Sequence, residues 1–165
     1  MDLLVAVDQD WGIGKDNKLM FSVPEDMSFF RQMTSGHTIV LGRKTLESFP
    51  HGKPLPNRRH IVLTRETELQ GERIEVVHSL RELLDRLEKI RGKVFLVGGA
   101  SIYQQLYRQC KTAYVTKIQA RGEADVFSPD LDHDPFFRLV EEEKPILSTS
   151  GLTFCFTKYE NIRLS

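Results

Sequence analysis

Residues 94–103 read Val-Phe-Leu-Val-Gly-Gly-Ala-Ser-Ile-Tyr, an apolar run that passes through two glycines into a helical pattern. A run of this kind, bounded by a Gly-Gly turn, predicts a buried strand followed directly by a helix. Strand and helix in succession form the unit of an α/β protein with parallel strands. The same succession recurs on both sides of this stretch.

Five further apolar runs predict strands at residues 3–7, 38–41, 60–63, 74–77 and 113–118. Helical periodicity lies between several of them, most clearly at residues 24–34, 80–90 and 101–108. Ser79 is placed to cap the second of these helices, and Glu82 three residues later completes a capping-box pattern. The alternation predicts an α/β fold built on a mostly parallel sheet.

The end of the chain has a different pattern. Residues 136–141 and 152–159 predict two strands with no helix between them, so we expect them to pair antiparallel at one edge of the sheet. Residues 8–23 form a long irregular stretch, which is more often a functional loop than idle chain. With 165 residues and no linker or repeat, the chain is expected to form one domain over residues 1–165.

Composition excludes several classes of function. The chain has 23 Lys and Arg against 23 Asp and Glu, so no overall field attracts nucleic acid or an anionic membrane. No stretch approaches the roughly 18 apolar residues of a membrane span. Cys110 and Cys155 form no metal-binding motif and suit a reducing compartment, so we expect a cytoplasmic protein. The five histidines show no metal-ligand spacing, and no metal is expected.

One carboxylate lies on the wrong side of a predicted helix. When residues 24–34 are placed at about 100° per residue, Asp26 falls among Phe29, Phe30 and Met33 on the apolar face. A buried, unpaired carboxylate is costly and its pKa rises, which is tolerable where it faces a ligand that supplies donors. The alternative is an ordinary first-turn Asp that the helix dipole favours.

Three strand ends carry features that suit phosphate groups. Gly98-Gly99 leaves backbone N–H groups open at a helix start, Gly42-Arg43-Lys44-Thr45 adds two cations and a hydroxyl, and Thr64-Arg65 ends another strand. Ligands of open α/β sheets bind beyond the carboxyl ends of strands, so these ends could converge on one polyanion. The added arginines favour NADP over NAD. A structural Gly-Gly turn and solvated surface charge remain the alternatives.

Arginines also precede the predicted strand at residues 60–63. The stretch Leu55-Pro-Asn-Arg58-Arg59 places two guanidinium groups where one could clamp a carboxylate with paired hydrogen bonds. For either arginine alone, an ordinary exposed side chain is the alternative.

In their order and spacing, these features resemble the dihydrofolate reductase family. The resemblance runs from about residue 2 to residue 159 and rests on Ala6, Gly12-Ile-Gly14, Pro24-Glu-Asp26, Gly42-Arg-Lys-Thr45, Pro54-Leu-Pro56 with Arg58, Gly98-Gly-Ala100 with Tyr103, and Thr116. It implies a central sheet of eight mostly parallel strands flanked by about four helices. It also implies NADPH-dependent reduction of 7,8-dihydrofolate to tetrahydrofolate in one-carbon metabolism, a reaction that antifolates target. Because nothing in the sequence marks a dimer interface, we expect a monomer.

The resemblance implies roles for the substrate side of the site. Asp26 would hold the 2-amino group and N3 of the pterin and promote protonation at N5, with Thr116 supporting the carboxylate and Phe21 and Leu19 nearby. Arg58 would clamp the glutamate carboxylate. The remaining substrate-binding positions that it implies are Leu4, Val5, Met27, Phe30, Arg31, Phe49, Lys53, Leu55 and Val97.

For NADPH, the resemblance implies three groups of contacts. Those near the nicotinamide are Ala6, Ile13, Gly14, Asn17, Lys18 and Leu19. Those near the phosphates and the adenosine are Gly42, Arg43, Lys44, Thr45, Leu63, Thr64, Arg65 and His78. Those on the Gly-Gly turn and the helix after it are Val97, Gly98, Gly99, Ala100, Ser101, Ile102, Tyr103 and Gln105, with a cis bond expected between the two glycines.

The chain departs from the family pattern before the first helix. Leu19-Met20-Phe21 stands where the family usually has Leu-Pro-Trp. Phe21 cannot supply the indole N–H donor, so the water network near N5 of the substrate must differ. Without the proline, the loop is less constrained.

Two other functions are compatible with the same fold. One is a related reductase acting on a pyrimidine precursor in riboflavin synthesis, against which Asp26 and Arg58 argue. The other is an NADP-binding protein that lost turnover through the change at residues 20 and 21. A hydrolase is disfavoured, because no Gly-x-Ser-x-Gly elbow is present.

Overall fold

The computed structural model describes residues 1–16, 18–19, 21–66, 71 and 73–164, with Lys18 and Leu19 described by their backbone alone. Its main sheet has eight strands in the order β10-β12-β8-β1-β7-β4-β5-β6, and a short strand, β11, pairs with β12. The strands are β1 (Asp2–Val7), β4 (Thr38–Gly42), β5 (Arg59–Leu63), β6 (Ile74–Val77), β7 (Val94–Gly98), β8 (Thr112–Ile118), β10 (Phe137–Glu142), β11 (Ile146–Leu147) and β12 (Thr153–Asn161).

The predicted strand directions are confirmed. The six strands from β8 to β6 are all parallel to one another. β12 runs antiparallel to β8, and β10 antiparallel to β12, which makes the antiparallel edge that the end of the chain predicts. The sheet is therefore mixed and mostly parallel.

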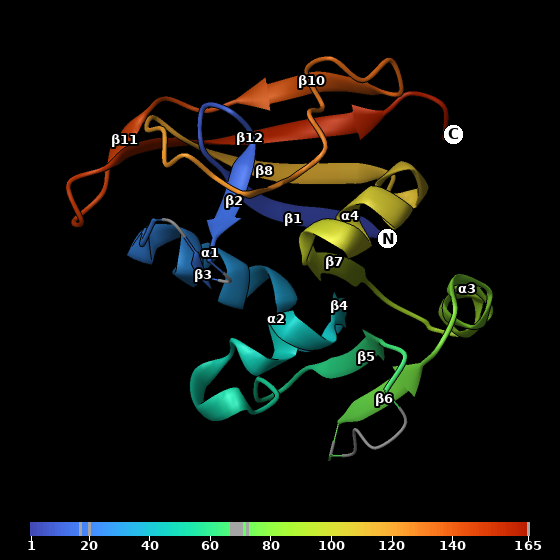
Figure 1. Cartoon of the computed structure of the whole chain (residues 1–165). Coiled ribbons are helices and arrows are strands. Elements are labelled where there is room, and N and C mark those ends of the chain that lie inside the picture. Colours follow the sequence, from blue (N-terminus) through green and yellow to red (C-terminus); the bar gives the residue numbers. More distant parts are fainter. Residues whose placement is uncertain (17, 20, 67–70, 72, 165) are drawn as a thin grey trace.

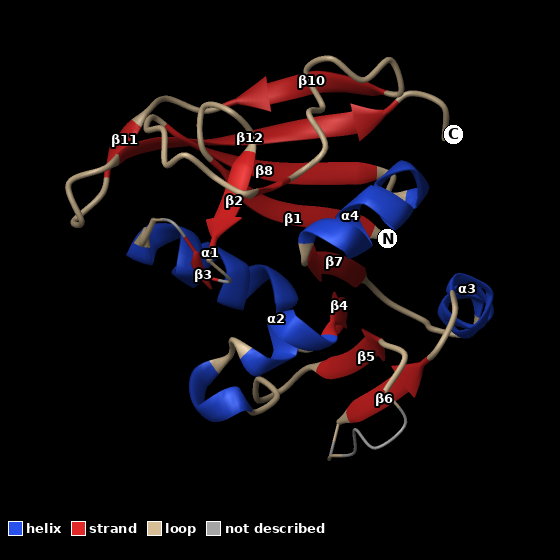
Figure 2. Cartoon of the chain, in the orientation of Figure 1, coloured by secondary structure: helices blue, strands red, loops and turns tan. Residues whose placement is uncertain are grey.

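Helices cover both faces of this sheet, as Figure 1 and Figure 2 show. α1 (Pro24–Thr34) and α2 (Arg43–Glu47) lie on one face, and α3 (Leu80–Glu88) and α4 (Ala100–Leu106) on the other. Single turns of 3-10 helix follow at Pro50–Gly52 and Tyr107–Gln109. These are the helices of the described residues, and the four α-helices match the expected number.

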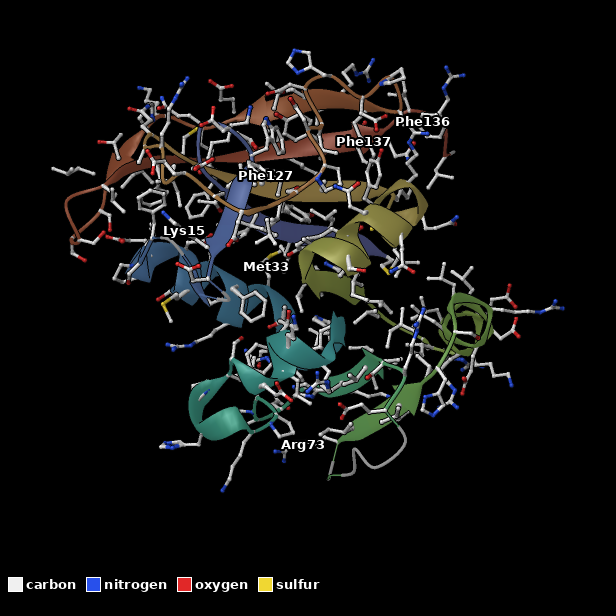
Figure 3. All side chains as sticks on the ribbon, viewed as in Figure 1. Lys15, Met33, Arg73, Phe127, Phe136 and Phe137 are labelled. Atoms are coloured by element: carbon white, nitrogen blue, oxygen red, sulfur yellow. The ribbon has the colours of Figure 1, made fainter. Side chains whose placement is uncertain are left out.

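The alternation of side chains along β1 divides the core between the two faces. Leu3 and Val7 pack with Leu83 and Ile102 of α3 and α4. Leu4 packs on the other face, with Leu46 of α2 and with Phe30 and Met33 of α1, the latter labelled in Figure 3. Successive residues of a strand point to opposite faces, so a buried parallel strand must be apolar on both.

Several predicted boundaries need correction. The helix expected at residues 80–90 ends at Glu88, and the one expected at 101–108 begins at Ala100 and continues as a 3-10 turn after Leu106. Ser79 caps α3 by accepting from the backbone N–H of Glu82, but the Glu82 carboxylate accepts from the N–H of His78 instead of Ser79. The strand expected to begin at residue 136 begins at Phe137, because Asp134 accepts the N–H groups of both Phe136 and Phe137 in a turn.

The stretch 8–23 is more regular than predicted. β2 (Gly12–Lys15) pairs antiparallel with β3 (Lys18–Leu19) and with β9 (Val126–Phe127), and the three form a second, small sheet. The carboxylate of Asp8 accepts from the N–H groups of Asp10, Gly12 and Gly122, so it joins the start of this stretch to the segment that leads to β9. None of the described helices is long and apolar enough to cross a membrane.

Candidate active site

The carboxylate of Asp26 lies at the start of α1, where the parallel strands end. Pro24 begins the helix after Val23, which provides no side-chain cap. The Thr116 hydroxyl on β8 donates to Asp26 Oδ1 at 2.5 Å, and Thr116 is the register partner of Ala6 on β1. The carboxylate is therefore fixed by its place on α1 and by a hydroxyl of β8, the strand next to β1.

Burial raises the pKa of Asp26 above its usual range, and the hydrogen bond from Thr116 opposes part of that rise. Apart from Thr116, no side-chain donor to Asp26 is found among the described residues. A carboxylate in this setting gains from a ligand that brings its own N–H donors. The alternative of a solvated first-turn Asp does not fit this geometry.

Apolar side chains beside α1 form a cluster, called the apolar wall below. Five of the expected substrate-binding residues pack in one cluster, namely Leu4, Phe30, Phe49, Leu55 and Val97. Ala6 and Phe21 pack in the neighbouring cluster around Val23, Ile118 and Phe154. Met27 is 48% exposed, and the side chain of Val5 packs in the core on the opposite face, so only the backbone of Val5 can face the α1 side of the sheet.

The other end of α1 holds a buried cation. Arg58 is only 8% exposed, and its guanidinium donates to Thr34 Oγ1 at 3.0 Å, to the Arg31 carbonyl at 2.8 Å and to the Pro56 carbonyl at 2.6 Å. All three acceptors are neutral, and among the described residues Arg58 has no carboxylate partner. Burial, with the nearby charge of Arg31, lowers the pKa of Arg58.

The next residue behaves differently. Arg59 is exposed and pairs with Glu75 on β6. Of the two candidate arginines, only Arg58 combines burial with the lack of a described counter-ion, which is the setting of an anion site. Arg31 and Lys53, which the resemblance also implies at the substrate site, are exposed.

The expected phosphate-binding strand ends do converge. Gly42 at the end of β4 pairs with Leu63 of β5, and Leu41 pairs with Gly98 of β7. A Cβ on Gly98 or Gly99 would lie 3.3 or 3.4 Å from Thr45 Oγ1, so the turn after β7 closely approaches the first turn of α2. The Gly98–Gly99 bond is cis, as the resemblance implies.

The helix after β7 is tied to the middle of the sheet. Ile102 lies 3.2 Å from a Cβ built on Gly42, and the Tyr103 hydroxyl donates to the Leu4 carbonyl at 2.6 Å. Burial, with the nearby charge of Asp26, raises the pKa of Tyr103, so this hydroxyl remains a donor. Gln105 donates to Ser101 on the exposed side of the helix, and Ala100 begins it.

The basic side chains near the expected phosphate site differ in whether a carboxylate of the chain already pairs with them. Arg43 pairs with Glu47 at 2.6 Å and with Glu66 at 3.3 Å, so carboxylates of the chain already neutralise it. Lys44 and Arg65 are exposed, and the ring of His78 contacts the Thr64 carbonyl at 2.8 Å.

The remaining expected contacts lie around the small sheet. Ile13 and Gly14 are in β2, and Ile13 packs against the core on the α4 face. Asn17 and Met20 lie outside the described residues, and Lys18 and Leu19 contribute only backbone to β3. Among the described residues, no group of His, Cys, Asp and Glu side chains could hold a metal ion.

Sequence reasoning missed several residues that connect the segments around the site to distant parts of the chain. Glu25 accepts from the Ser148 hydroxyl at 2.7 Å and from the Thr149 N–H at 3.0 Å. Asp125 accepts from the N–H of Asp16 at 3.0 Å. Each contact joins positions more than 100 residues apart, and no local pattern signals such a pairing.

Replacing Thr116 by Val is expected to raise the pKa of Asp26 further, because it removes the donor that favours the ionised form. The change is measured from the pH dependence of the Asp26 carboxyl carbon in an NMR titration. Thr157→Val is the matched control, since Thr157 is a buried threonine on β12 that donates to the Val115 carbonyl instead. An unchanged Asp26 titration in Thr116→Val would contradict the assigned hydrogen bond.

Comparison with known proteins agrees with this geometry. The family profile described as "Dihydrofolate reductase" matches residues 1–161. The dihydrofolate reductase of Bacillus subtilis (strain 168) is 38% identical over 144 residues, which cover 87% of this chain and 83% of that protein. The enzyme of Staphylococcus aureus (strain Mu50) is 36% identical over 129 residues, which cover 78% of this chain and 77% of that protein.

A solved structure shares the fold. It is described as dihydrofolate reductase from Enterococcus faecalis complexed with NADP(H) and RAB-propyl, with a TM-score of 0.87 and 32% identity. The match covers 98% of this chain and 95% of that one. These matches agree with the hydrogen-bonded carboxylate of Asp26 and with the converging strand ends. The chain belongs to the dihydrofolate reductase family.

Proposed function

We propose that this protein reduces 7,8-dihydrofolate to 5,6,7,8-tetrahydrofolate with NADPH and so supports one-carbon metabolism. Family membership supports the reaction, and one observation carries it. A half-buried carboxylate, Asp26, and a buried cation without a described carboxylate partner, Arg58, lie at opposite ends of α1 with an apolar wall between them.

The spacing of these two groups suits the substrate. Arg58 contacts Thr34, which is eight residues after Asp26 on the same helix, a rise of about 12 Å. Dihydrofolate has a flat heterocycle with N–H donors at one end, an aromatic ring in the middle and carboxylates at the other end. In this proposal Asp26 holds the 2-amino group and N3 of the pterin, and Arg58 holds the glutamate carboxylate.

The residues present also fit the cofactor. Gly98 and Gly99 lack the Cβ atoms that would come within 3.3 to 3.4 Å of Thr45, so their backbone N–H groups stay open to a pyrophosphate. Thr45, Lys44 and Arg65 would contact phosphate groups, and Ala6 leaves room beside Thr116 for a flat ring. When bound, NADPH supplies the hydride that is transferred to C6 of the pterin.

The protein's part is to position the substrate and to favour its protonation. Asp26 fixes the pterin ring through hydrogen bonds and its negative charge favours the N5-protonated form, so that N5 gains a proton as C6 gains the hydride. Thr116 fixes the carboxylate. The raised pKa of Asp26 allows the group to take up and release protons closer to neutral pH than an exposed Asp would.

The test is a steady-state assay that follows loss of the NADPH absorbance with 7,8-dihydrofolate at neutral pH. Rapid, dihydrofolate-dependent oxidation of NADPH is the expected result. A parallel assay offers the pyrimidine precursor of riboflavin synthesis, which lacks a glutamate tail for Arg58 and should react poorly. Turnover of that pyrimidine alone, or of neither compound, would overturn the proposal.

The proposal extends to the organisation of the protein. One domain over residues 1–165 carries the whole site, and the enzyme works as a monomer that binds no nucleic acid. A cytoplasmic location is part of the proposal, and the two free, buried cysteines are compatible with a reducing compartment. Light scattering of the purified protein tests the monomer.

Phe21→Trp is expected to change the pH dependence of hydride transfer. Phe21 packs against the same cluster as Ala6, and its ring offers no hydrogen-bond donor for water near N5 of the substrate, whereas an indole N–H would. We expect faster transfer, or transfer that persists to higher pH, in the variant. Pre-steady-state rates measured across pH provide the comparison, and coincident profiles for the two proteins would refute this account of Phe21.

A further inference from the structure

A buried histidine lies beneath the tail end of the proposed substrate site. His60 is the second residue of β5 and is 0% exposed. Its Nε2 accepts a hydrogen bond from the backbone N–H of Leu55 at 3.0 Å, and its ring meets that of Phe49 at 6.2 Å between centroids in an edge-on arrangement. Leu55 and Phe49 both belong to the apolar wall.

The bond to Leu55 fixes a segment with little secondary structure. Residues 53–58 connect a 3-10 turn to β5, and Pro54 and Pro56 cannot donate backbone hydrogen bonds. The segment is anchored after Leu55 by the Asn57 carbonyl, which accepts from Gly36, and by Arg58. Before that point, the ring of His60 supplies the contact that orients the Leu55 backbone.

The contact requires one protonation state. Nε2 can accept only when it carries no proton, so the neutral ring has its proton on Nδ1. Burial lowers the pKa of His60, and the charges of Arg58 and Arg73 act in the same direction, whereas backbone carbonyls of these two residues act against it. Arg73, labelled in Figure 3, directly precedes β6, the strand that pairs with β5. The neutral, accepting ring is therefore the form present at neutral pH.

We infer that His60 is a positioning residue that holds the Leu55 segment and thereby sets the affinity of the site for the aminobenzoyl-glutamate half of its substrate. The inference rests on the proposed function, because it assigns the tail subsite of that same reaction. His60 acts through Leu55 and Phe49 and does not meet the reacting atoms. A change at His60 should not disturb the Asp26 end of the site, which α1 and β8 form.

Two variants separate the hydrogen bond from the bulk of the ring. His60→Phe keeps a flat, buried ring but removes the acceptor, whereas the carbonyl oxygen of His60→Gln reaches about as far as Nε2 and can accept from Leu55. We expect the KM for dihydrofolate to rise about five- to tenfold in His60→Phe with a much smaller change in kcat. His60→Gln should restore most of the loss. With 7,8-dihydropterin, which lacks the tail, the difference between the two variants should disappear.

The pH dependence provides a second test that does not depend on the folding of His60→Phe. As the pH falls through the lowered pKa of His60, Nε2 gains a proton and can no longer accept from Leu55. The ratio of the wild-type KM to the His60→Gln KM should therefore rise toward acid pH. Titration of Asp26 and of the substrate affects both proteins and cancels in this ratio.

The outcomes are distinct. Equal KM values for wild type and both variants would overturn the role of His60. An equal rise of KM in His60→Phe and His60→Gln, together with a wild-type to His60→Gln KM ratio that does not change with pH, would also overturn it. Either result would leave the proposed reductase activity intact. A wild-type protein that does not reduce dihydrofolate at all would instead overturn the proposed function, and this inference with it.

Discussion

Asp26→Asn is expected to lower the rate of dihydrofolate reduction at neutral pH by about a hundredfold or more, the range in which proton transfer by a positioned group contributes. The amide keeps the shape of the side chain and its contact with Thr116, but it removes the negative charge that favours protonation at N5. The loss should become smaller at low pH, where the substrate arrives already protonated. Single-turnover hydride-transfer rates across pH measure the effect.

Glu25→Gln is the matched control for this change. Glu25 is the preceding carboxylate on α1, but it contacts Ser148 and Thr149 instead of the pocket. The Glu25→Gln variant should therefore have a hydride-transfer rate within a small factor of the wild-type rate. Wild-type rates in Asp26→Asn at neutral pH would mean that the carboxylate has been assigned the wrong role.

The same substitution has a predicted effect on stability. Because the pKa of Asp26 is raised in the folded protein, ionisation of Asp26 disfavours folding, and this cost grows as the pH rises from the ordinary Asp range through the raised pKa. Asp26→Asn removes that cost and should unfold at a higher temperature than wild type at neutral pH. The difference should shrink at acid pH, where both side chains are neutral. A functional carboxylate that reduces stability is a common compromise at active sites.

Arg58→Gln is expected to weaken dihydrofolate binding by about 10- to 100-fold, with a smaller effect on kcat, because charge-assisted hydrogen bonds to the glutamate carboxylate are lost. The side chain also supports the end of α1 through Thr34 and Arg31, so some loss of thermal stability should accompany it. Dissociation constants from fluorescence titration, measured with NADPH-free enzyme, provide the readout.

Two comparisons make this second prediction specific. Arg59→Gln removes the neighbouring arginine, which forms an exposed ion pair with Glu75. Exposed ion pairs contribute little to stability, so the Arg59→Gln protein should bind dihydrofolate normally. The affinity for 7,8-dihydropteroate, a substrate without the glutamate, should hardly change in Arg58→Gln. Equal weakening for dihydrofolate and dihydropteroate would show that Arg58 acts through the fold alone.

Most of the fold could be predicted because its signals are local. The predicted helix at residues 24–34 matches α1 at both ends, since Pro24 provides a natural first-turn residue. The strand predicted at residues 74–77 matches β6 in the same way. Parallel strands buried on both faces leave continuous apolar runs, and these identify the sheet without knowledge of its strand order.

The small sheet of β2, β3 and β9 could not be predicted. Its strands are two to four residues long, and what holds them is pairing such as Gly12 with Phe127 and the bonds of Asp8 to Gly122. Contacts between such distant positions leave no periodic pattern in either segment. This is why residues 8–23 looked irregular in the sequence.

The site was predicted unevenly for the same reason. The helical pattern alone identifies Asp26 as a carboxylate on an apolar face, and the structure confirms its partial burial. The pattern does not choose between Arg58 and Arg59, because the choice depends on which of them meets the end of α1. Nor does it reveal that Arg43 is already paired with two carboxylates, one of them supplied by a different segment.

A crystal structure of the protein with NADPH and folate tests the central claim most directly. The account predicts that both carboxylate oxygens of Asp26 lie within hydrogen-bonding distance of N3 and the 2-amino group of the pterin, with the nicotinamide ring stacked against C6. It also predicts the glutamate carboxylate on Arg58. A pterin bound away from Asp26, or a nicotinamide out of contact with C6, would contradict it.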